Sequence, residues 1–351
     1  MRDAFLKIVK RAGEWPADAL LIAGDLFEHD RVNGDTVAFL RAAFESIPHV
    51  PVFIAPGNHD PYLPDSPYAT KRWPNNVFLF TTPVWTAHEL ARLPLTVHGF
   101  GFDGPDISSN PFGKLVVPSD GREHVAVAHG SEMGSLPPGK GAHAPFDANA
   151  AVPDGLRYLA LGHYHGAKKI PVRNGVWVQY SGSPEGHDFG EPGLHTYAEV
   201  ELDGRDIRVR EVPSASAVFE THAIDCAKCE STQEIVDAIR ALPAPDSVAR
   251  IARIVLSGAA PQEIHAGLAA IYDALRTGFD HLELVDRLEL EEDFAALANE
   301  QSSLGGFIAA LNAQLRDTTD ERHRAVLLRS REVGLAAYRG RTLPIRGAFG
   351  E

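Results

Sequence analysis

Four short apolar runs, each ending at a glycine, constrain the fold of this chain more than any other feature. They read ALLIAG, VPVFIAPG, HVAVAHG and LRYLALG, and they end at Gly24, Gly57, Gly130 and Gly162. Continuous apolar runs of this length are typical of strands that are buried on both faces. Between the first two runs, residues 31–46 carry a helix-start signal and a helical apolar stripe, which predicts a β-α-β unit. The sequence therefore predicts a layered α/β fold, with helices or a second sheet covering each side.

The composition predicts a folded protein rather than a disordered chain. A length of 351 residues with 44% hydrophobic content can bury a substantial core, and it favours two folded units. The formal net charge of -14 neither supports nor excludes DNA, because a local basic strip can act within an acidic chain. The two cysteines are too few for a disulfide framework, and no run of 18 apolar residues is present. We therefore expect a cytoplasmic protein with no membrane segment.

The pattern changes twice along the chain, which predicts three regions. Residues 1–212 form the first domain, and within it the alternating pattern of residues 176–212 predicts antiparallel strands that close the domain. After a linker, residues 218–290 mix strand-like and helical runs, which predicts a smaller α+β domain. Residues 291–345 carry helical stripes, which predicts a helical C-terminal tail.

A polar cluster lies at the end of each of the four apolar runs. The clusters are Gly24-Asp25, Gly57-Asn58-His59-Asp60, His129-Gly130 and Gly162-His163-Tyr164-His165. Because the carboxyl ends of adjacent strands converge in open α/β sheets, residues distant in sequence can meet there. Aspartate, asparagine and histidine are oxygen and nitrogen donors, so we expect a divalent metal centre.

The order of these four clusters resembles the calcineurin-like metallophosphoesterases, and within them the DNA repair exonuclease branch of SbcD and YhaO-like proteins. The resemblance rests on motifs in residues 1–210 and on architecture beyond them. It implies a layered β-sandwich flanked by helices, followed by a capping domain. It also implies that Asp25 bridges two metal ions, that Asn58, His129 and His163 complete the second metal site, and that His165 ligates the first.

The resemblance assigns the catalytic roles to the second cluster. His59 would act as a general acid or transition-state donor, and Asp60 would orient its imidazole. Two divalent cations can generate hydroxide from bound water for attack on a phosphodiester and can stabilise the attacking and leaving oxygens. Imidazole ligands favour manganese, iron or zinc over magnesium, and the resemblance implies Mn²⁺.

One family motif is missing from the sequence. Family members begin with a strand that ends in Asp-x-His, whereas here 23 residues precede Gly24 and no aspartate has a histidine two positions later. We therefore expect a lopsided site, in which the first metal keeps only Asp25 and His165 and binds weakly or not at all. Either the start codon is assigned too late or the subunit has lost its first strand. We favour the first explanation, because every other motif is kept.

Several signals have two interpretations. His98-Gly99 also follows a strand-like run and is an alternative to His129. The strip of Arg205, Arg208 and Arg210 could contact a phosphate backbone or could be a solvated strand edge, and we weigh these equally. Cys226 and Cys229 have redox spacing, but a metal knuckle needs two more ligands, so we interpret them as incidental.

The function that the resemblance implies is a metal-dependent phosphodiesterase, the exonuclease or endonuclease subunit of a DNA repair complex with an SbcC-like SMC-type ATPase. The helical tail would dock on that ATPase. A homodimer is a further hypothesis for the assembly. The alternatives are a phosphoesterase acting on nucleotides or small phosphoesters, and a non-catalytic scaffold with an incomplete metal site.

Overall fold

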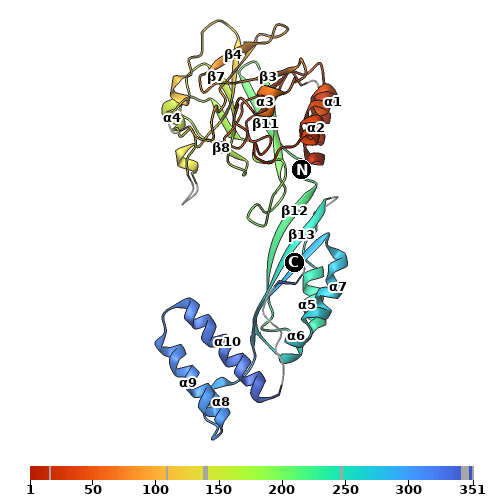
Figure 1. Ribbon diagram of the computed structural model, residues 1–351, viewed down its shortest axis with the longest axis vertical. Helices are drawn as coiled ribbons and strands as arrows, with labels where there is room; N and C mark the ends of the chain where they lie inside the picture. The colour runs from red at the N-terminus through yellow and green to blue at the C-terminus, as the bar shows by residue number, and fades with distance from the viewer. Residues whose placement is uncertain (16, 108–109, 137–140, 246–247, 341–347, 350–351) are drawn as a thin grey trace. The chain divides into compact units, whose positions relative to one another are not determined.

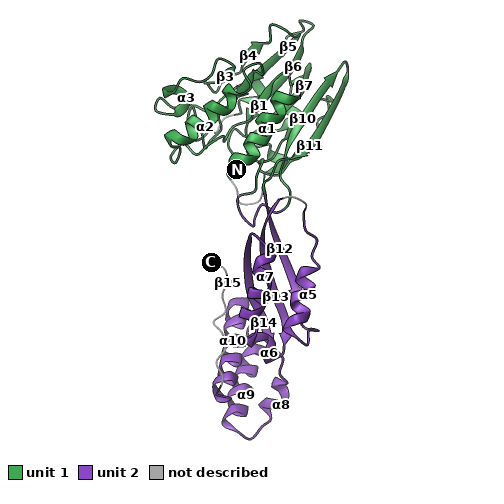
Figure 2. Ribbon diagram, turned by 90° about the vertical axis from the view of Figure 1, so that its right-hand side faces the viewer, with its two compact units in different colours: residues 1–186, 193–216 green, residues 187–192, 217–351 purple. Residues whose placement is uncertain are grey.

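The computed structural model describes the chain except for residues 16, 108–109, 137–140, 246–247, 341–347 and 350–351 (Figure 1). The chain divides into two compact units. Unit 1 comprises residues 1–186 and 193–216, and unit 2 comprises residues 187–192 and 217–351 (Figure 2). Each unit has its own hydrophobic core, so each is described by itself.

Unit 1 begins with a helix and a β-α-β arrangement. Its first sheet has the order β1-β2-β3 and all three strands are parallel, as expected when helices provide the connections. The helix α2 starts where the side chain of Asn33 accepts a hydrogen bond from the Thr36 amide at 2.9 Å, which satisfies one free amide of the first turn. The elements are α1 (Arg2–Glu14), β1 (Leu20–Ile22), α2 (Gly34–Glu45), β2 (Val52–Ile54) and β3 (Val77–Leu79).

A second sheet of six strands has the order β4-β5-β6-β7-β9-β8. Strands β5, β6, β7 and β9 are parallel, and β4 and β8 add antiparallel edges. The prediction of antiparallel strands in residues 176–212 holds for the pair of β9 with β8, whereas β9 pairs in parallel with β7 on its other side. The strands are β4 (Thr86–Glu89), β5 (Leu95–Gly99), β6 (Glu123–His129), β7 (Leu156–Gly162), β8 (Lys168–Ile170) and β9 (Trp177–Tyr180).

The two sheets of unit 1 pack into a sandwich. Val52 and Ile54 of β2 face the core under α1 and α2, whereas Phe53 faces the other way into a core with Val125 and Val127 of β6. This alternation follows from the two-residue period of a strand. The far face of the six-stranded sheet has its own core, which includes Phe112 and Phe146 stacked at a 3.7 Å centroid distance, and it is covered by short elements. These are η1 (Phe112–Lys114), η2 (Met133–Ser135) and α4 (Ala148–Ala151).

Two further elements complete unit 1. The short helix α3 (Pro67–Thr70) follows β2, and the antiparallel hairpin β10 (Thr196–Asp203) and β11 (Asp206–Pro213) closes the unit. Apolar side chains of the hairpin, Val200 and Val209 among them, pack onto the core between the sheets.

Unit 2 alternates strands and helices around a parallel sheet. The strands β12 (Ala217–Asp225), β13 (Ala249–Ala260) and β14 (His281–Leu290) are parallel, and β15 (Ala348–Phe349) adds a short antiparallel edge. The core joins the sheet to the helices on one face, so this unit mixes α and β elements as the composition of residues 218–290 suggests. The helices are α5 (Thr232–Arg240), α6 (Gln262–Ala266) and α7 (Leu268–Leu275), followed by η3 (Arg276–Gly278).

The helices α8 (Phe294–Ala298), α9 (Ser303–Asp317) and α10 (Glu321–Tyr338) follow β14. Ile308 of α9 and Leu335 of α10 are fully buried in one small core, so these two helices pack against each other (Figure 1). The last residues of the predicted tail, 341–345, lie outside the described residues. In the part of the chain that the structure describes, no helix is long and apolar enough to cross a membrane.

Candidate metal centre

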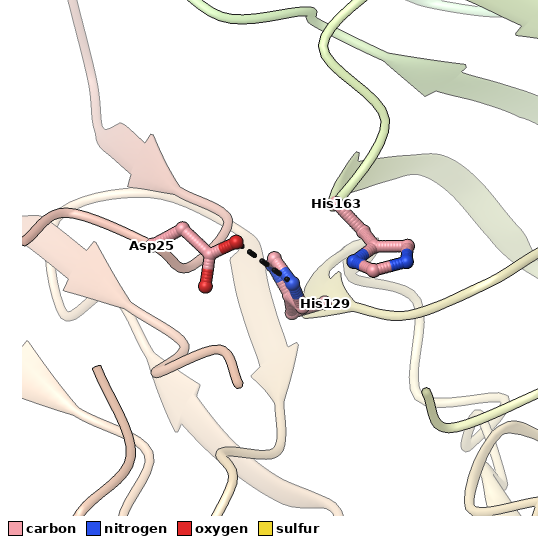
Figure 3. A group of neighbouring side chains, drawn as sticks. All are labelled: Asp25, His129 and His163. Carbon is pink, nitrogen blue, oxygen red and sulfur yellow. Dashed lines mark ion pairs between the residues drawn. The ribbon is translucent and has the colours of Figure 1, made fainter. Parts of the chain in front are cut away.

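The carboxyl ends of four strands converge in unit 1. Ile22 of β1 lies level with Ile54 of β2, and His129 of β6 lies level with Gly162 of β7. The polar residues that follow these strands therefore meet where the two sheets face each other. A carboxylate oxygen of Asp25 and one ring nitrogen each of His129 and His163 lie within 4.8 Å of one another, which suits a metal ion. Figure 3 shows the Asp25 carboxylate pointing toward His129, with the two imidazoles side by side.

His129 is the buried centre of this group, and both of its ring nitrogens face oxygen atoms. Its side chain is 0% exposed, and Nδ1 lies 2.8 Å from the carbonyl oxygen of Ala23. A neutral imidazole carries one ring proton, and with that proton on Nδ1, donated to this carbonyl, Nε2 presents a lone pair. That lone pair faces Oδ1 of Asn58 at 2.9 Å and Oδ2 of Asp25 at 3.3 Å. Three acceptor atoms that face one another repel, and a cation between them turns this repulsion into attraction.

His163 completes the group from an uncommon backbone conformation. Its φ is 116°, and Asp25 also has a positive φ of 54°, which is rare for residues other than glycine. Backbone strain of this kind clusters at functional sites, where the surrounding structure enforces it. Burial and the neighbouring His129 lower the pKa of His163 to about 4, and burial also lowers the pKa of His129. Both rings are therefore neutral at pH 7, which is the form that binds a metal.

Two glycines leave the space that this group needs. A Cβ on Gly57 would lie 2.8 Å from Nδ1 of His129 and closer still to the Asp25 carboxylate. Gly24 has a φ of +82°, and a Cβ there would overlap the same imidazole. The glycines in the first two clusters thus allow the backbone to approach the side chains of the centre.

Asp60 ties the two strand-end loops together. It is fully buried, and its oxygens accept hydrogen bonds from the amides of Asp25 (2.9 Å), Leu26 (2.8 Å) and Gly57 (2.6 Å) and from the hydroxyl of Tyr68 (2.7 Å). Burial and the charge of Asp25 raise its pKa to about 7, although the four donors favour its ionised form. Asp60 therefore holds the backbone of Asp25 in its strained conformation.

His59 lies at the rim of the centre, half exposed. Its amide donates to Oδ1 of Asp25 at 3.0 Å, and its Nδ1 lies 3.0 Å from Oε2 of Glu28. Burial alone would lower the pKa of His59, but the hydrogen bond to Glu28 and the charges of Asp25 and Glu28 raise it overall. We predicted that Asp60 orients this imidazole. In the structure Glu28 contacts the imidazole instead, because the oxygens of Asp60 accept hydrogen bonds from backbone amides of the two strand-end loops.

Two other candidates are not part of this group. His165 is exposed in the loop after β7, and the structure does not bring it into the group of Asp25, His129 and His163. His98, the alternative to His129, is buried in β5, and its Nε2 lies 2.9 Å from Nδ1 of His124. It therefore belongs to the packing of the six-stranded sheet.

The basic strip is largely engaged in ion pairs along the hairpin of unit 1. Arg208 pairs with Glu201 at 3.6 Å, and Arg210 pairs with Glu199. These contacts are those of a solvated strand edge.

Sequence reasoning missed two residues that shape the centre. Glu28 follows Asp25 by three positions, so its place in the first loop was a usable signal. Tyr68 lies eight residues beyond Asp60 in a short helix, and its apolar ring hides its role as a donor to a buried carboxylate.

Comparison with known proteins identifies the class of this fold and centre. Residues 1–167 match the family model of the calcineurin-like phosphoesterases. These residues carry a calcineurin-like metallophosphoesterase domain, and the proteins of that family are hydrolases that use divalent metal ions.

Two relatives show where in the family the similarity lies. The chain is 25% identical over 285 residues to the uncharacterized metallophosphoesterase YhaO of Bacillus subtilis, covering 79% of this chain and 67% of that protein. It is 25% identical over 242 residues to the DNA double-strand break repair protein Mre11 of Methanosarcina mazei, covering 63% of this chain and 36% of that protein. The chain thus spans about two thirds of the first relative and about a third of the second.

Proposed function

We propose that this protein is a metal-dependent phosphodiesterase whose centre is formed by Asp25, Asn58, His129 and His163. The observation that carries the proposal is that Nε2 of His129 lies within 3.3 Å of two oxygen atoms, Oδ1 of Asn58 and Oδ2 of Asp25. A buried, neutral imidazole facing two oxygen acceptors is the donor set of a divalent metal site. The family whose model residues 1–167 match uses such metals for phosphoester hydrolysis.

The residues of the centre have distinct tasks in this proposal. Asp25, Asn58, His129 and His163 would hold the ion. The bound ion would act as a Lewis acid toward a phosphoryl oxygen and would activate water. His59 stands beside Asp25 and donates a proton from its imidazole to the departing oxygen.

The partner of His59 supports this task. A carboxylate against Nδ1 leaves Nε2 as the nitrogen that meets the substrate, and it stabilises the protonated ring. Glu28 supplies that carboxylate at 3.0 Å.

The metal assignment is tested by elemental analysis of the protein after incubation with Mn²⁺. We expect one equivalent of manganese in the parent chain and none in the His129→Ala variant, whose change removes the nitrogen at the centre of the group. A His98→Ala variant, which alters a buried histidine away from the group, is the matched control and should keep the metal. Manganese retained by His129→Ala would contradict the proposed ligand set.

We propose DNA as the substrate and the repair of DNA as the role. The support is the similarity to a relative whose name is DNA double-strand break repair protein Mre11. The assay compares the hydrolysis of linear duplex DNA, single-stranded DNA and bis-p-nitrophenyl phosphate by the manganese-loaded protein. Cleavage of DNA with dependence on His59 supports the proposal. Hydrolysis of the small diester alone would favour a phosphoesterase for nucleotides, and a metal-loaded protein that is inactive on all three would favour a scaffold.

We also propose that α10 is the contact with an SbcC-like ATPase partner. Val326 and Val333 of α10 are 57% and 48% exposed, and they lie seven residues apart, on the same face of the helix. Apolar residues at heptad spacing pack against a second helix, as in a coiled coil. Light scattering of the chain mixed with the ATPase of the same genome should show a complex that Val326→Glu with Val333→Glu abolishes. A homodimer would appear instead as a doubled mass of the chain alone.

A further inference from the structure

One more histidine lies beside the metal centre, held there by a tightly bonded loop. The amide of His143 donates to Oγ of Ser131 at 3.0 Å, and the amide of Ser131 donates back to the carbonyl of His143 at 2.8 Å. The next residue, Ala144, is fully buried with a φ of 45° and donates to the carbonyl of Ile107 at 2.6 Å. A buried alanine in the left-handed region costs free energy, so the surrounding hydrogen bonds must enforce it. The loop therefore fixes the position of His143.

The side chain of His143 is oriented toward the centre by two contacts. Its Nδ1 lies 3.1 Å from Oδ1 of Asp106, and its ring centroid lies 5.5 Å from that of His163 at a steep angle of 70°. A carboxylate only accepts, so Nδ1 donates to Asp106. Nε2 is then the nitrogen available to a ligand, with a lone pair in the neutral ring and a proton to donate in the imidazolium. His143 is one of the charges that lower the pKa of both His129 and His163, which confirms its proximity to the group.

His143 does not fit as a fourth nitrogen ligand of the ion. The ligand atoms that lie within 4.8 Å of one another come from Asp25, His129 and His163, and His143 is outside that group. It stands instead next to His163, with a carboxylate behind it, as in the pairs of aspartate and histidine that position a ring toward a substrate. A bound phosphodiester brings negative charge to the centre. The charges that shift the pKa of His129 and His163 most are those of Asp25 and of neighbouring histidines, so a histidine is a suitable donor to that negative charge.

We propose that His143, oriented by Asp106, binds the substrate as an imidazolium and donates a hydrogen bond from Nε2 to a non-bridging phosphoryl oxygen at the metal centre. This inference rests on the proposed phosphodiesterase function, and it adds a substrate-binding residue from a loop that carries none of the family-like motifs. A donor flanked by the Asp106 carboxylate and a phosphoryl oxygen makes a hydrogen bond between charged groups, which is stronger than a neutral one.

The test measures inorganic phosphate binding to the full chain loaded with manganese, by calorimetry, together with the manganese content. For His143→Ala we expect phosphate binding about 10- to 100-fold weaker, as for loss of a hydrogen bond between charged groups, with the manganese content unchanged. Asp106→Asn should weaken binding less, because the ring remains. His143→Gln should restore part of the affinity through its amide donor. His49→Ala, which changes an exposed histidine, is the control and should bind as the parent does.

Hydrolysis of bis-p-nitrophenyl phosphate provides a second readout, in which the change should raise KM more than it lowers kcat. Phosphate affinity in His143→Ala equal to that of the parent would overturn the inference while leaving the proposed function intact. Loss of manganese in His143→Ala would also overturn it, because His143 would then be a metal ligand. A parent chain that holds manganese but neither binds phosphate nor hydrolyses the diester would instead overturn the proposed function.

Discussion

Removal of the Tyr68 hydroxyl isolates one of the four donors that hold Asp60. The hydroxyl is buried and donates to Oδ2 at 2.7 Å, and in the Tyr68→Phe variant that oxygen keeps only the Leu26 amide at 2.8 Å. The ring contacts of Tyr68 with Phe27 and Trp73 remain, so no large cavity forms. A hydrogen bond contributes about 0.5–1.5 kcal/mol between neutral groups and about 1.5–3 kcal/mol with a charged partner. We therefore expect the free energy of unfolding of unit 1 to fall by about 1–3 kcal/mol.

Tryptophan fluorescence during urea unfolding measures this change, because all four tryptophans of the chain, Trp15, Trp73, Trp85 and Trp177, lie in unit 1. The matched control is Tyr158→Phe. Tyr158 is equally buried, and burial raises its pKa without a hydrogen bond among the causes, so the loss of its hydroxyl should cost less. Equal losses in the two variants, or no loss in Tyr68→Phe, would refute the role assigned to Asp60 and its donors.

Three further changes test other parts of the structure. Gly57→Ala should abolish manganese binding, measured by elemental analysis, because the added Cβ would overlap the side chains of the centre. Gly166→Ala is the control: its added Cβ meets nothing within 4 Å, so manganese binding should be unchanged. Hydrogen bonds from Arg11 and neighbouring donors lower the pKa of Glu199 from 4.5 to about 2, so Glu199 stabilises unit 1 above pH 4.5 and this contribution disappears as the pH falls toward 2. The urea midpoint should therefore fall more steeply between pH 6 and pH 3 in the parent than in Glu199→Gln. Ile254→Ala, in the core of unit 2, should cost about 2–5 kcal/mol by circular dichroism and leave the tryptophan transition unmoved.

The layered fold could be predicted because its signals are local. The apolar runs that end at Gly24, Gly57, Gly130 and Gly162 coincide with β1, β2, β6 and β7 and the residues directly after them. Their polar clusters meet because parallel strands place their carboxyl ends on the same edge. The partner of β9 could not be predicted, since an alternating run of four residues has the same pattern in a parallel or an antiparallel pair.

The side-chain partners within the centre depend on contacts that no spacing records. Glu28 and Asp60 are both carboxylates near His59, and the resemblance to the family implied that Asp60 is its partner. In the structure, Asp60 is drawn into the protein by three backbone amides and Tyr68, whereas Glu28 remains at the surface where the imidazole lies. His143 is harder still to predict, because its position depends on a loop whose hydrogen bonds reach Ser131 and Ile107.

Several features of the centre each oppose folding, and the packed core of unit 1 must offset their free-energy cost. Asp25 and His163 adopt positive φ angles, Asp60 is a buried carboxylate, and acceptor atoms face one another around His129. Each strained backbone position costs about 1–3 kcal/mol, and a cation would remove only the repulsion between the acceptors. The strain therefore has to be enforced by the packed sheets on either side, which bury apolar side chains next to the same strand ends. Selection for stability alone would replace these residues, so their combination at one strand-end junction is what a functional site there would require.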